Sequence, residues 1–140
     1  AAFGNDYVNP PNLPYNTYWA PNTDLALEKE FFIDGVLLEP IQLNVASDNG
    51  FMVFINGEQV AKANAEGYTV YWEYEISLLP PDFLSPGSNL IQVLAEDHGG
   101  ATYFDLELTG DVAPVPEPTT LFLLGTGLLG LAGFRRKIKK

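Results

Sequence analysis

The side chains best suited to chemistry lie in two short stretches of this chain. One stretch is Asp48-Asn49-Gly50, and the other is Asp97-His98-Gly99-Gly100. Carboxylate and amide oxygens are ligands that calcium prefers in proteins, and a histidine close to an aspartate is a common arrangement for general-base catalysis. The two stretches therefore suggest two chemistries, cation binding and acid–base catalysis.

Catalysis is the weaker of the two interpretations. His98 is the only histidine, cysteine is absent, and no serine stands in a recognisable nucleophile turn. Three carboxylate pairs are each separated by one residue, so on strands they would share the solvent face. These pairs are Glu28 with Glu30, Glu73 with Glu75, and Asp105 with Glu107. The sequence predicts a protein that is not an enzyme, with no catalytic residue and with His98 at a hairpin tip.

Cation binding stays open. Asp48, Asn49, Asp82 and Asp97 place hard oxygen ligands in turns, but their spacing is not that of an EF-hand loop. The alternative is turn chemistry, in which Asx side chains bond to their own backbone. A structural calcium ion and plain turns both fit the sequence, and no other cofactor is expected.

The elements that would position these turns are β-strands. Apolar and polar residues alternate in segments 41–46, 70–76 and 103–108, and further strands are expected at 25–33, 51–55, 58–61 and 90–96. The alternation puts Trp72 and Tyr74 on the core face and leaves Tyr71 outside. Tyr71 alone would give a carbohydrate little aromatic surface to stack on.

Turn residues separate these strands. Asn56-Gly57 is the clearest hairpin signal, because a type I′ turn needs positive φ at both central positions. Other turns are expected at Asp48-Asn49-Gly50, Pro80-Pro81, Ser85-Pro86-Gly87 and Gly99-Gly100. Short strands at this spacing, with no helical segment before Thr119, predict an all-β fold, an antiparallel sandwich over residues 23–112.

The first 22 residues differ from the rest of the chain in composition, because asparagine and proline are interleaved there with aromatic residues. Prolines exclude a central strand, so we expect an arm at 1–22. The arm either lies on its own sandwich or binds a partner, since aromatic side chains give large contact area. The candidate partner-binding residues are Tyr7, Tyr15, Tyr18 and Trp19.

The C-terminal region combines an apolar run with a basic end. Residues 119–134 carry no charge, and five of the seven basic residues follow them. A helix of this length rises roughly 24 Å, which is short for a bilayer, but flanking basic side chains can snorkel to cover the difference. We expect a transmembrane helix at 119–134 and, from the positive-inside bias at Arg135, Arg136 and Lys137, a cytoplasmic end at 135–140.

One face of that helix carries small residues, which allow another helix to approach closely. The candidate helix-packing residues are Thr126, Gly127, Gly130 and Gly133. Membrane lipid and membrane-protein partners are therefore expected.

A Pro-rich stalk at 113–118 precedes the apolar run and contains Val115, Pro116, Glu117 and Pro118. The order of stalk, Gly-rich helix and Arg-rich end resembles the PEP-CTERM sorting signal of bacterial surface proteins, which an exosortase is thought to recognise and process. The resemblance covers about a fifth of the chain, and it implies export with sorting or processing at these four residues. The alternative is a single-pass anchor with a chance Pro-Glu-Pro.

A second resemblance lies in the strands. Residues 46–57, with Asp48-Asn49-Gly50 and Asn56-Gly57, then Trp72, then residues 84–95, are similar to the galactose-binding-like jelly-roll modules found beside glycoside hydrolases and on surface proteins. This resemblance implies a fold and, in related jelly rolls, often a structural ion. It carries over no ligand.

The distribution of charge and the first residues of the sequence indicate the protein's partners and its location in the cell. All 18 acidic residues lie in 1–118 with only Lys29 and Lys62, so nucleic acid is excluded as a partner. The sequence starts at Ala1-Ala2-Phe3, as expected after cleavage of a signal peptide. We expect a single-pass protein of the bacterial inner membrane with a periplasmic or extracytoplasmic ectodomain and a cytoplasmic C-terminus.

Two functions fit these observations. The first is an accessory subunit of a larger membrane complex, for example respiratory or photosynthetic, without enzymatic activity. The second is an exosortase-processed surface protein that binds carbohydrate or extracellular matrix.

Overall fold

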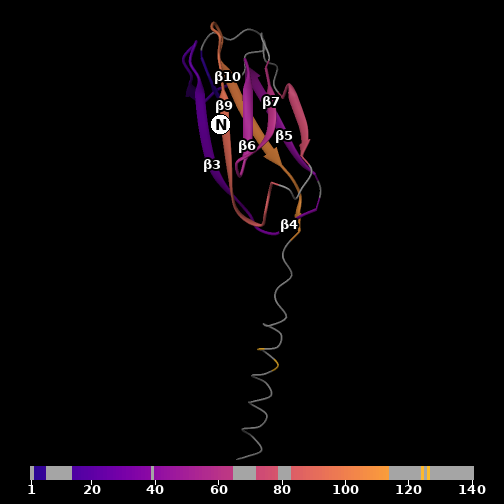
Figure 1. The fold of residues 1–140 in the computed structure, drawn as a ribbon. Helices are drawn as coiled ribbons and strands as arrows, with labels where there is room; N and C mark the ends of the chain where they lie inside the picture. The colour runs from indigo at the N-terminus through magenta and orange to yellow at the C-terminus, as the bar shows by residue number, and fades with distance from the viewer. Residues whose placement is uncertain are drawn as a thin grey trace, which may run out of the picture.

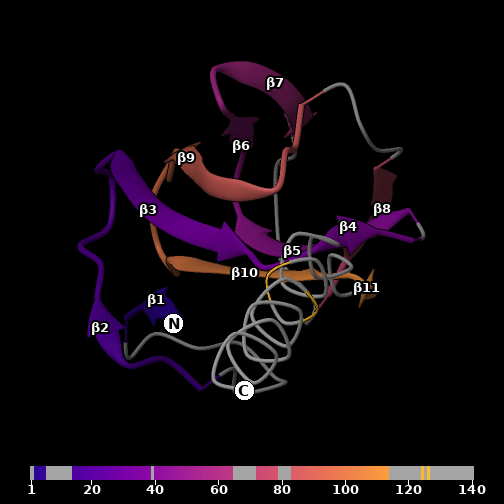
Figure 2. The ribbon, with the colours of Figure 1, turned by 90° about the horizontal axis from the view of Figure 1, so that it is seen from below.

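The computed structural model describes residues 2–5, 14–38, 40–64, 72–78 and 83–113, together with Leu124 and Thr126. Within these ranges the chain forms two β-sheets that lie face to face, as the two layers in Figure 2 show. The fold is therefore the all-β sandwich that the alternating sequence pattern predicts.

The larger sheet has five strands in the order β2-β1-β10-β5-β8, and the smaller has four in the order β3-β9-β6-β7 (Figure 1). A short pair, β11-β4, lies apart from them. All pairs are antiparallel except β1 with β2, which is parallel. The strands are β1 Phe3–Gly4, β2 Thr17–Tyr18, β3 Leu25–Ile33, β4 Val36–Leu37, β5 Ile41–Asp48, β6 Phe51–Ile55, β7 Glu58–Ala63, β8 Tyr74–Leu78, β9 Gly87–Ala95, β10 Tyr103–Thr109 and β11 Val112–Ala113.

Alternate residues of each sheet point into the space between the layers, as the period of two requires. Leu43 and Val45 of β5 face Val53 and Ile55 of β6, and all four side chains are fully buried. Phe104 of β10 joins the same core. Burial on this scale is the main favourable term that holds the two sheets together.

The β6–β7 hairpin turns at Asn56-Gly57, as predicted. Asn56 has φ 51° and Gly57 has φ 87°, so both central residues have left-handed backbone conformations. A register shift between Val53 and Phe54 then places Val60 opposite no single partner, which is a β-bulge. The prediction of this turn from two residues is confirmed.

The strand predicted at 70–76 is wrong at its start. Within the described residues β8 begins at Tyr74, and Trp72 lies in a turn with φ 55°. Tyr74 faces the core as predicted, and its ring packs edge-on against the ring of Phe51, with 5.0 Å between the two ring centroids. Trp72 instead packs against a separate buried cluster that contains Ala46 and Tyr103, not against the main core.

The N-terminal residues lie on their own sandwich. β1 pairs with β10, and β2 extends the sheet beside β1. Trp19 is 4% exposed and packs in the main core, so its indole cannot serve as a partner contact. Tyr15 packs at the outer face of the larger sheet, and Tyr18 stays 63% exposed.

No helix among the described residues has the length and apolar character that a membrane crossing needs. Leu124 and Thr126 are helical, and the rest of the predicted transmembrane segment 119–134 lies outside the described residues. The transmembrane helix therefore stays a prediction.

Candidate functional site

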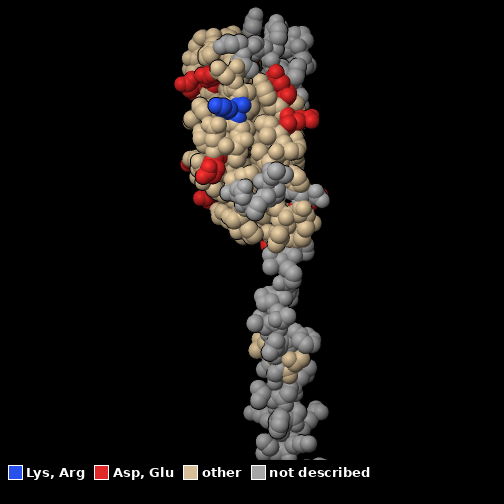
Figure 3. All heavy atoms as spheres, turned by 45° about the vertical axis from the view of Figure 1, so that its right-hand side comes forward, with Lys and Arg blue, Asp and Glu red and all other residues tan. Residues whose placement is uncertain are grey.

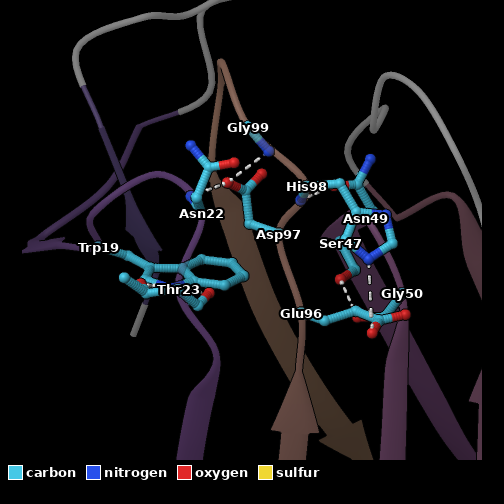
Figure 4. A network of polar contacts seen from close by, with 10 residues as sticks. All are labelled: Trp19, Asn22, Thr23, Ser47, Asn49, Gly50, Glu96, Asp97, His98 and Gly99. Carbon is cyan, nitrogen blue, oxygen red and sulfur yellow. Dashed lines mark hydrogen bonds and ion pairs between the residues drawn. The ribbon is translucent and has the colours of Figure 1, made fainter.

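The sandwich has two ends, and its strands bring Asp48, Asn49 and Asp97 together at one of them. Asp48 ends β5, Asn49 lies in the turn before β6, and Asp97 follows β9. We call the end formed by residues 15–23, 48–50 and 96–102 the loop end (Figure 4). Three of the four candidate cation ligands predicted from the sequence are thus neighbours, although Asn49 and Asp97 are far apart in the sequence.

Asp97 is the most deeply buried acid of the loop end and is 5% exposed. Its Oδ2 accepts hydrogen bonds from the backbone N–H of Asn22 at 2.6 Å and of Gly99 at 2.9 Å. Its Oδ1 is buried and accepts no hydrogen bond from the residues that the structure describes. A buried carboxylate oxygen without a partner is rare in native proteins and calls for an explanation.

Asp48 shares this environment and is 8% exposed. Burial is the main cause that raises the pKa of Asp48 from 3.8 to about 6, and the nearby Asp97 and Glu73 carboxylates raise it further. The loop end therefore concentrates negative charge in a place that water solvates poorly.

Backbone hydrogen bonds fix the geometry around these acids. The N–H of Asn49 donates to the carbonyl of Glu96 at 2.9 Å, and the N–H of Glu96 donates to the carbonyl of Gly50 at 3.0 Å. The Oδ1 of Asn49 accepts from the N–H of His98 at 2.7 Å (Figure 4). His98 is exposed, and its Nε2 lies 3.6 Å from Oε2 of Glu96.

The oxygen atoms of these side chains are of the type that binds calcium. Asp97 Oδ1 and the Asp48 carboxylate are hard oxygen ligands, and calcium completes its shell flexibly with carbonyl, amide and water oxygens. No cluster of three or more His, Cys, Asp or Glu side chains with metal-binding geometry occurs among the described residues. The site would therefore depend on two carboxylates and on neutral oxygens. Asp82, the fourth candidate, lies outside the described residues.

A groove of about 590 Å³ opens at the same end of the smaller sheet. Met52 and Leu94 face outward from neighbouring strands and form an apolar floor with exposures of 40% and 47%. Polar side chains surround this floor, and they belong to Asp24, Lys62, Asn64 and Glu96. Ligand sites commonly have roughly this volume and this mixture of apolar floor and few polar groups.

Gly50 and Glu96 line the groove and also belong to the hydrogen-bonded loop end. The groove and the acidic cluster thus share a wall. Sequence reasoning missed the groove, because outward-facing Met52 and Leu94 look like ordinary interruptions of a polar face.

The charges on the surface are spread unevenly. In Figure 3 a small basic area lies within a mostly uncharged face, and acidic groups lie toward both of its margins. Lys29 and Lys62 are the only lysines within the described ranges, and Lys62 lines the groove.

The outer face of the larger sheet carries a second buried cluster that the sequence did not predict. Ala2, Ala46 and Tyr103 are buried there beneath Tyr15 and Trp72. Asp105 pairs with Ala46 and is 8% exposed, which corrects its predicted place on a solvent face. The reason is that the N-terminal residues cover this end of the sheet.

The remaining predicted site residues divide into two groups. Tyr18 and the helical Thr126 are described, and Tyr18 lies exposed in β2 at the loop end. The others lie outside the described residues: Tyr7, Val115, Pro116, Glu117, Pro118, Gly127, Gly130, Gly133, Arg135, Arg136 and Lys137.

Comparison with known families identifies the C-terminal segment. Residues 114–137 match the PEP-CTERM protein-sorting motif. The match confirms the resemblance seen in the Pro-Glu-Pro, apolar and basic order. A PEP-CTERM signal implies export from the cytoplasm with anchoring at the C-terminal end.

Solved structures share the sandwich fold. The GH78 family rhamnosidase of Bacillus sp. GL1 matches with TM-score 0.51 and 22% identity, over 66% of this chain and 11% of the enzyme. The alpha-L-rhamnosidase of Streptomyces avermitilis, complexed with L-rhamnose, gives TM-score 0.51 and 22% identity over 65% of this chain and 9% of the enzyme. A PA14 sugar-binding domain from an RTX adhesin matches with TM-score 0.42 and 23% identity, over 69% of this chain and 49% of the adhesin chain.

The matched region is thus about a tenth of each rhamnosidase, and at this identity the likeness shows the fold alone. No curated protein matches the chain.

Proposed function

We propose that this chain is a PEP-CTERM surface protein that an exosortase sorts and processes at residues 115–118, and that its β-sandwich binds carbohydrate without enzymatic activity. The observation that carries the proposal is the sorting motif at 114–137. The motif favours this function over an accessory subunit of a membrane complex, for which neither the described residues nor the comparisons give support. Before processing, segments 119–134 and 135–140 would hold the protein in the inner membrane.

The layout of the sandwich suits display on a surface. β10 runs from Tyr103, which pairs with Asp48 at the loop end, to Thr109, which pairs with Gln42 at the other end. The chain then passes through β11 to Ala113, just before the sorting motif (Figure 1). The loop end and its groove therefore lie at the end of the sandwich remote from Ala113.

The groove supports carbohydrate as the ligand class. A pyranose ring has apolar C–H faces and hydroxyl edges, which fit an apolar floor at Met52 and Leu94 with polar groups around it. The carboxylates of Asp24 and Glu96 accept hydrogen bonds from hydroxyls, while Lys62 donates them. A net charge of −11 argues against polyanions as the preferred ligand.

The test is titration of the full-length chain in mild detergent with neutral, deoxy-sugar and acidic polysaccharides. We expect binding to at least one class, and we expect Leu94→Glu to weaken it at least about tenfold, because a charge on the apolar floor must be desolvated. Leu94 is 47% exposed, so the fold should tolerate the change.

Phe32→Glu is the matched control. Phe32 is 71% exposed and lies on the same outer face, at the far end of β3 and away from the groove. Its replacement should leave binding unchanged. Absence of binding across the panel, or equal losses in both variants, would contradict the proposed ligand and groove; selective binding of an extended peptide would do the same.

A further inference from the structure

Apolar side chains are exposed at the end of the sandwich from which the chain continues to the sorting motif. The exposed large apolar residues within the described ranges of the sandwich are Tyr18, Phe32, Val36, Leu38, Met52, Leu94 and Val112. Met52 and Leu94 form the groove floor, and Tyr18 belongs to the loop end. The other four lie at the end opposite the loop end, and we call them the anchor-side patch.

We propose that the anchor-side patch docks on the interface of the lipid bilayer while the C-terminal segment anchors the chain, before processing. The proposal rests on the anchoring step of the proposed function and adds a lipid-contacting surface to it. It does not depend on whether the groove binds carbohydrate.

The β4–β11 pair gives the patch a fixed backbone. β11 pairs with β4, and the N–H of Leu38 donates to the carbonyl of Asp111 at 3.1 Å. Leu37 packs against the main core, so alternation directs the neighbouring Val36 and Leu38 away from it. These two side chains are exposed by 51% and 63%. Their exposure therefore follows from the strand geometry.

Gly35 allows β11 to lie close to the turn that joins β3 to β4. Its φ is 147°, in the left-handed region that favours glycine, and a Cβ there would lie 2.5 Å from Cγ1 of Val112. Only Ile33 and Asp34 separate Gly35 from Phe32, which is 71% exposed near the end of β3. The end of β3, β4 and β11 thus bring the patch to one end of the sandwich (Figure 1).

The length of chain after Ala113 determines what lies in front of the patch. Residues 114–118 separate Ala113 from the uncharged run at 119–134. Five residues span at most about 18 Å even when fully extended, so a bilayer that holds 119–134 lies within that reach of β11. A tether this short gives an effective concentration of roughly millimolar. Contacts that are weak in free solution are then sufficient for docking.

The charges around the patch indicate the kind of surface that it fits. Asp34 and Asp111 are exposed beside it, whereas the lysines of the described ranges, Lys29 and Lys62, lie on β3 and β7 away from it. Anionic head groups would repel these acids, so burial of apolar side chains is the attractive force. Two copies meeting through this patch would bring their acids together, which like-charge repulsion opposes. A zwitterionic bilayer interface therefore fits the patch better than a second copy does.

The test uses the full-length chain reconstituted in phosphatidylcholine vesicles that carry a nitroxide in the head-group region. The chain has no cysteine, so a fluorophore can be attached at one introduced thiol. Ser88→Cys places it beside the patch, because Ser88 is exposed and pairs with Phe32. Ala26→Cys places it at the loop end of the same face. We expect strong quenching of the probe at position 88 and little at position 26.

Phe32→Glu combined with Leu38→Glu tests whether the patch causes the docking. Both side chains are exposed, so the fold should tolerate the changes. Charged side chains resist transfer into the lipid interface, so we expect quenching at position 88 to fall at least about threefold. Leu94→Glu is the matched control, because it adds a charge to the groove floor and should leave the quenching unchanged.

Equal quenching at position 88 in the double variant and the original patch would overturn the docking, and so would equal quenching of the two probes. Self-association that the double variant abolishes without a change in quenching would assign the patch to a second copy and overturn the proposal. Should the double variant not fold, Val36→Glu replaces it with the same expected loss, and unchanged quenching there would overturn the proposal.

Two further measurements separate this proposal from the proposed function. If the full-length chain fails to float with the vesicles, the anchoring is wrong and the docking fails with it. Flotation with no effect of the patch variants would overturn the docking alone. Carbohydrate titration of the double variant reports on the groove independently, and we expect it to be unchanged.

Discussion

The two ends of the sandwich use buried polar side chains in different ways. At the end opposite the loop end, which we call the turn end, Asn89 is 2% exposed and lies beside the Asn56-Gly57 turn. At the loop end, Asp97 is similarly buried, yet one of its oxygens has no partner among the described residues. One polar group has a complete set of hydrogen bonds and the other does not.

Asn89 uses both ends of its amide. Its Oδ1 accepts from the N–H of Ser85 at 3.1 Å and from Nδ2 of Asn56 at 2.8 Å. Its Nδ2 donates to the carbonyls of Ser85 at 2.8 Å and Gly87 at 3.1 Å. A satisfied amide of this kind specifies a turn and leaves nothing for a ligand. The turn end is thus held together by its own hydrogen bonds, whereas the loop end keeps a buried carboxylate oxygen that accepts none from the described residues.

The largest effect should come from the turn end. Asn89→Ala leaves several buried groups without partners, so we expect a loss of about 3 kcal/mol in the free energy of unfolding. Chemical denaturation of the full-length chain measures this, with and without calcium. Asn16→Ala, at an exposed position, is the control. A loss that depends on calcium would contradict a purely structural role for Asn89.

A smaller effect should appear at Asp48 as a dependence of stability on pH. The pKa of Asp48 is raised in the folded state from 3.8 to about 6 by burial and by the facing Asp97 and Glu73 carboxylates. The folded state thus holds this proton more tightly than the unfolded state. Its stabilising contribution is full below pH 3.8 and is lost as the pH rises through 6.

We therefore expect the free energy of unfolding in chelator to fall by roughly 2–3 kcal/mol across this window on account of Asp48. Asp48→Asn should remove that part of the pH dependence, which denaturation curves at successive pH values measure. Identical pH profiles for the variant and the original chain would show that Asp48 is solvated like an ordinary surface acid.

Much of the fold follows from the sequence, because local signals determine it. The limits of β3 and β6 agree with the predicted strands 25–33 and 51–55, and the Asn56-Gly57 turn has the φ values that its residue types favour. Period-two alternation also identified the core faces of β5 and β10. These features depend on neighbours in the sequence.

Other features depend on contacts between distant residues. Trp72 leaves the predicted strand because its backbone turns left-handed, and Asp105 is buried because N-terminal residues cover an outward face. Trp19 belongs to the core although its Pro-rich surroundings look like an arm.

The candidate site was predictable only in its parts. Asp48, Asn49 and Asp97 stood out as turn residues with oxygen ligands. Their convergence required the antiparallel pairing of β6 with β9, which brings the 48–50 turn beside the loop after β9. The groove floor at Met52 and Leu94 carried no signal of its own, since single apolar residues on a surface are common.

We propose that the C-terminal motif sorts the sandwich to the cell surface, where its loop end is exposed. The most direct test of this proposal is the intact mass of the native protein, isolated from both the surface and the membrane fractions of the producing cells. We expect the surface form to end near residues 115–118 and to lack the segments at 119–134 and 135–140. A protein that keeps its mass through Lys140 and co-purifies only with membrane proteins would contradict it.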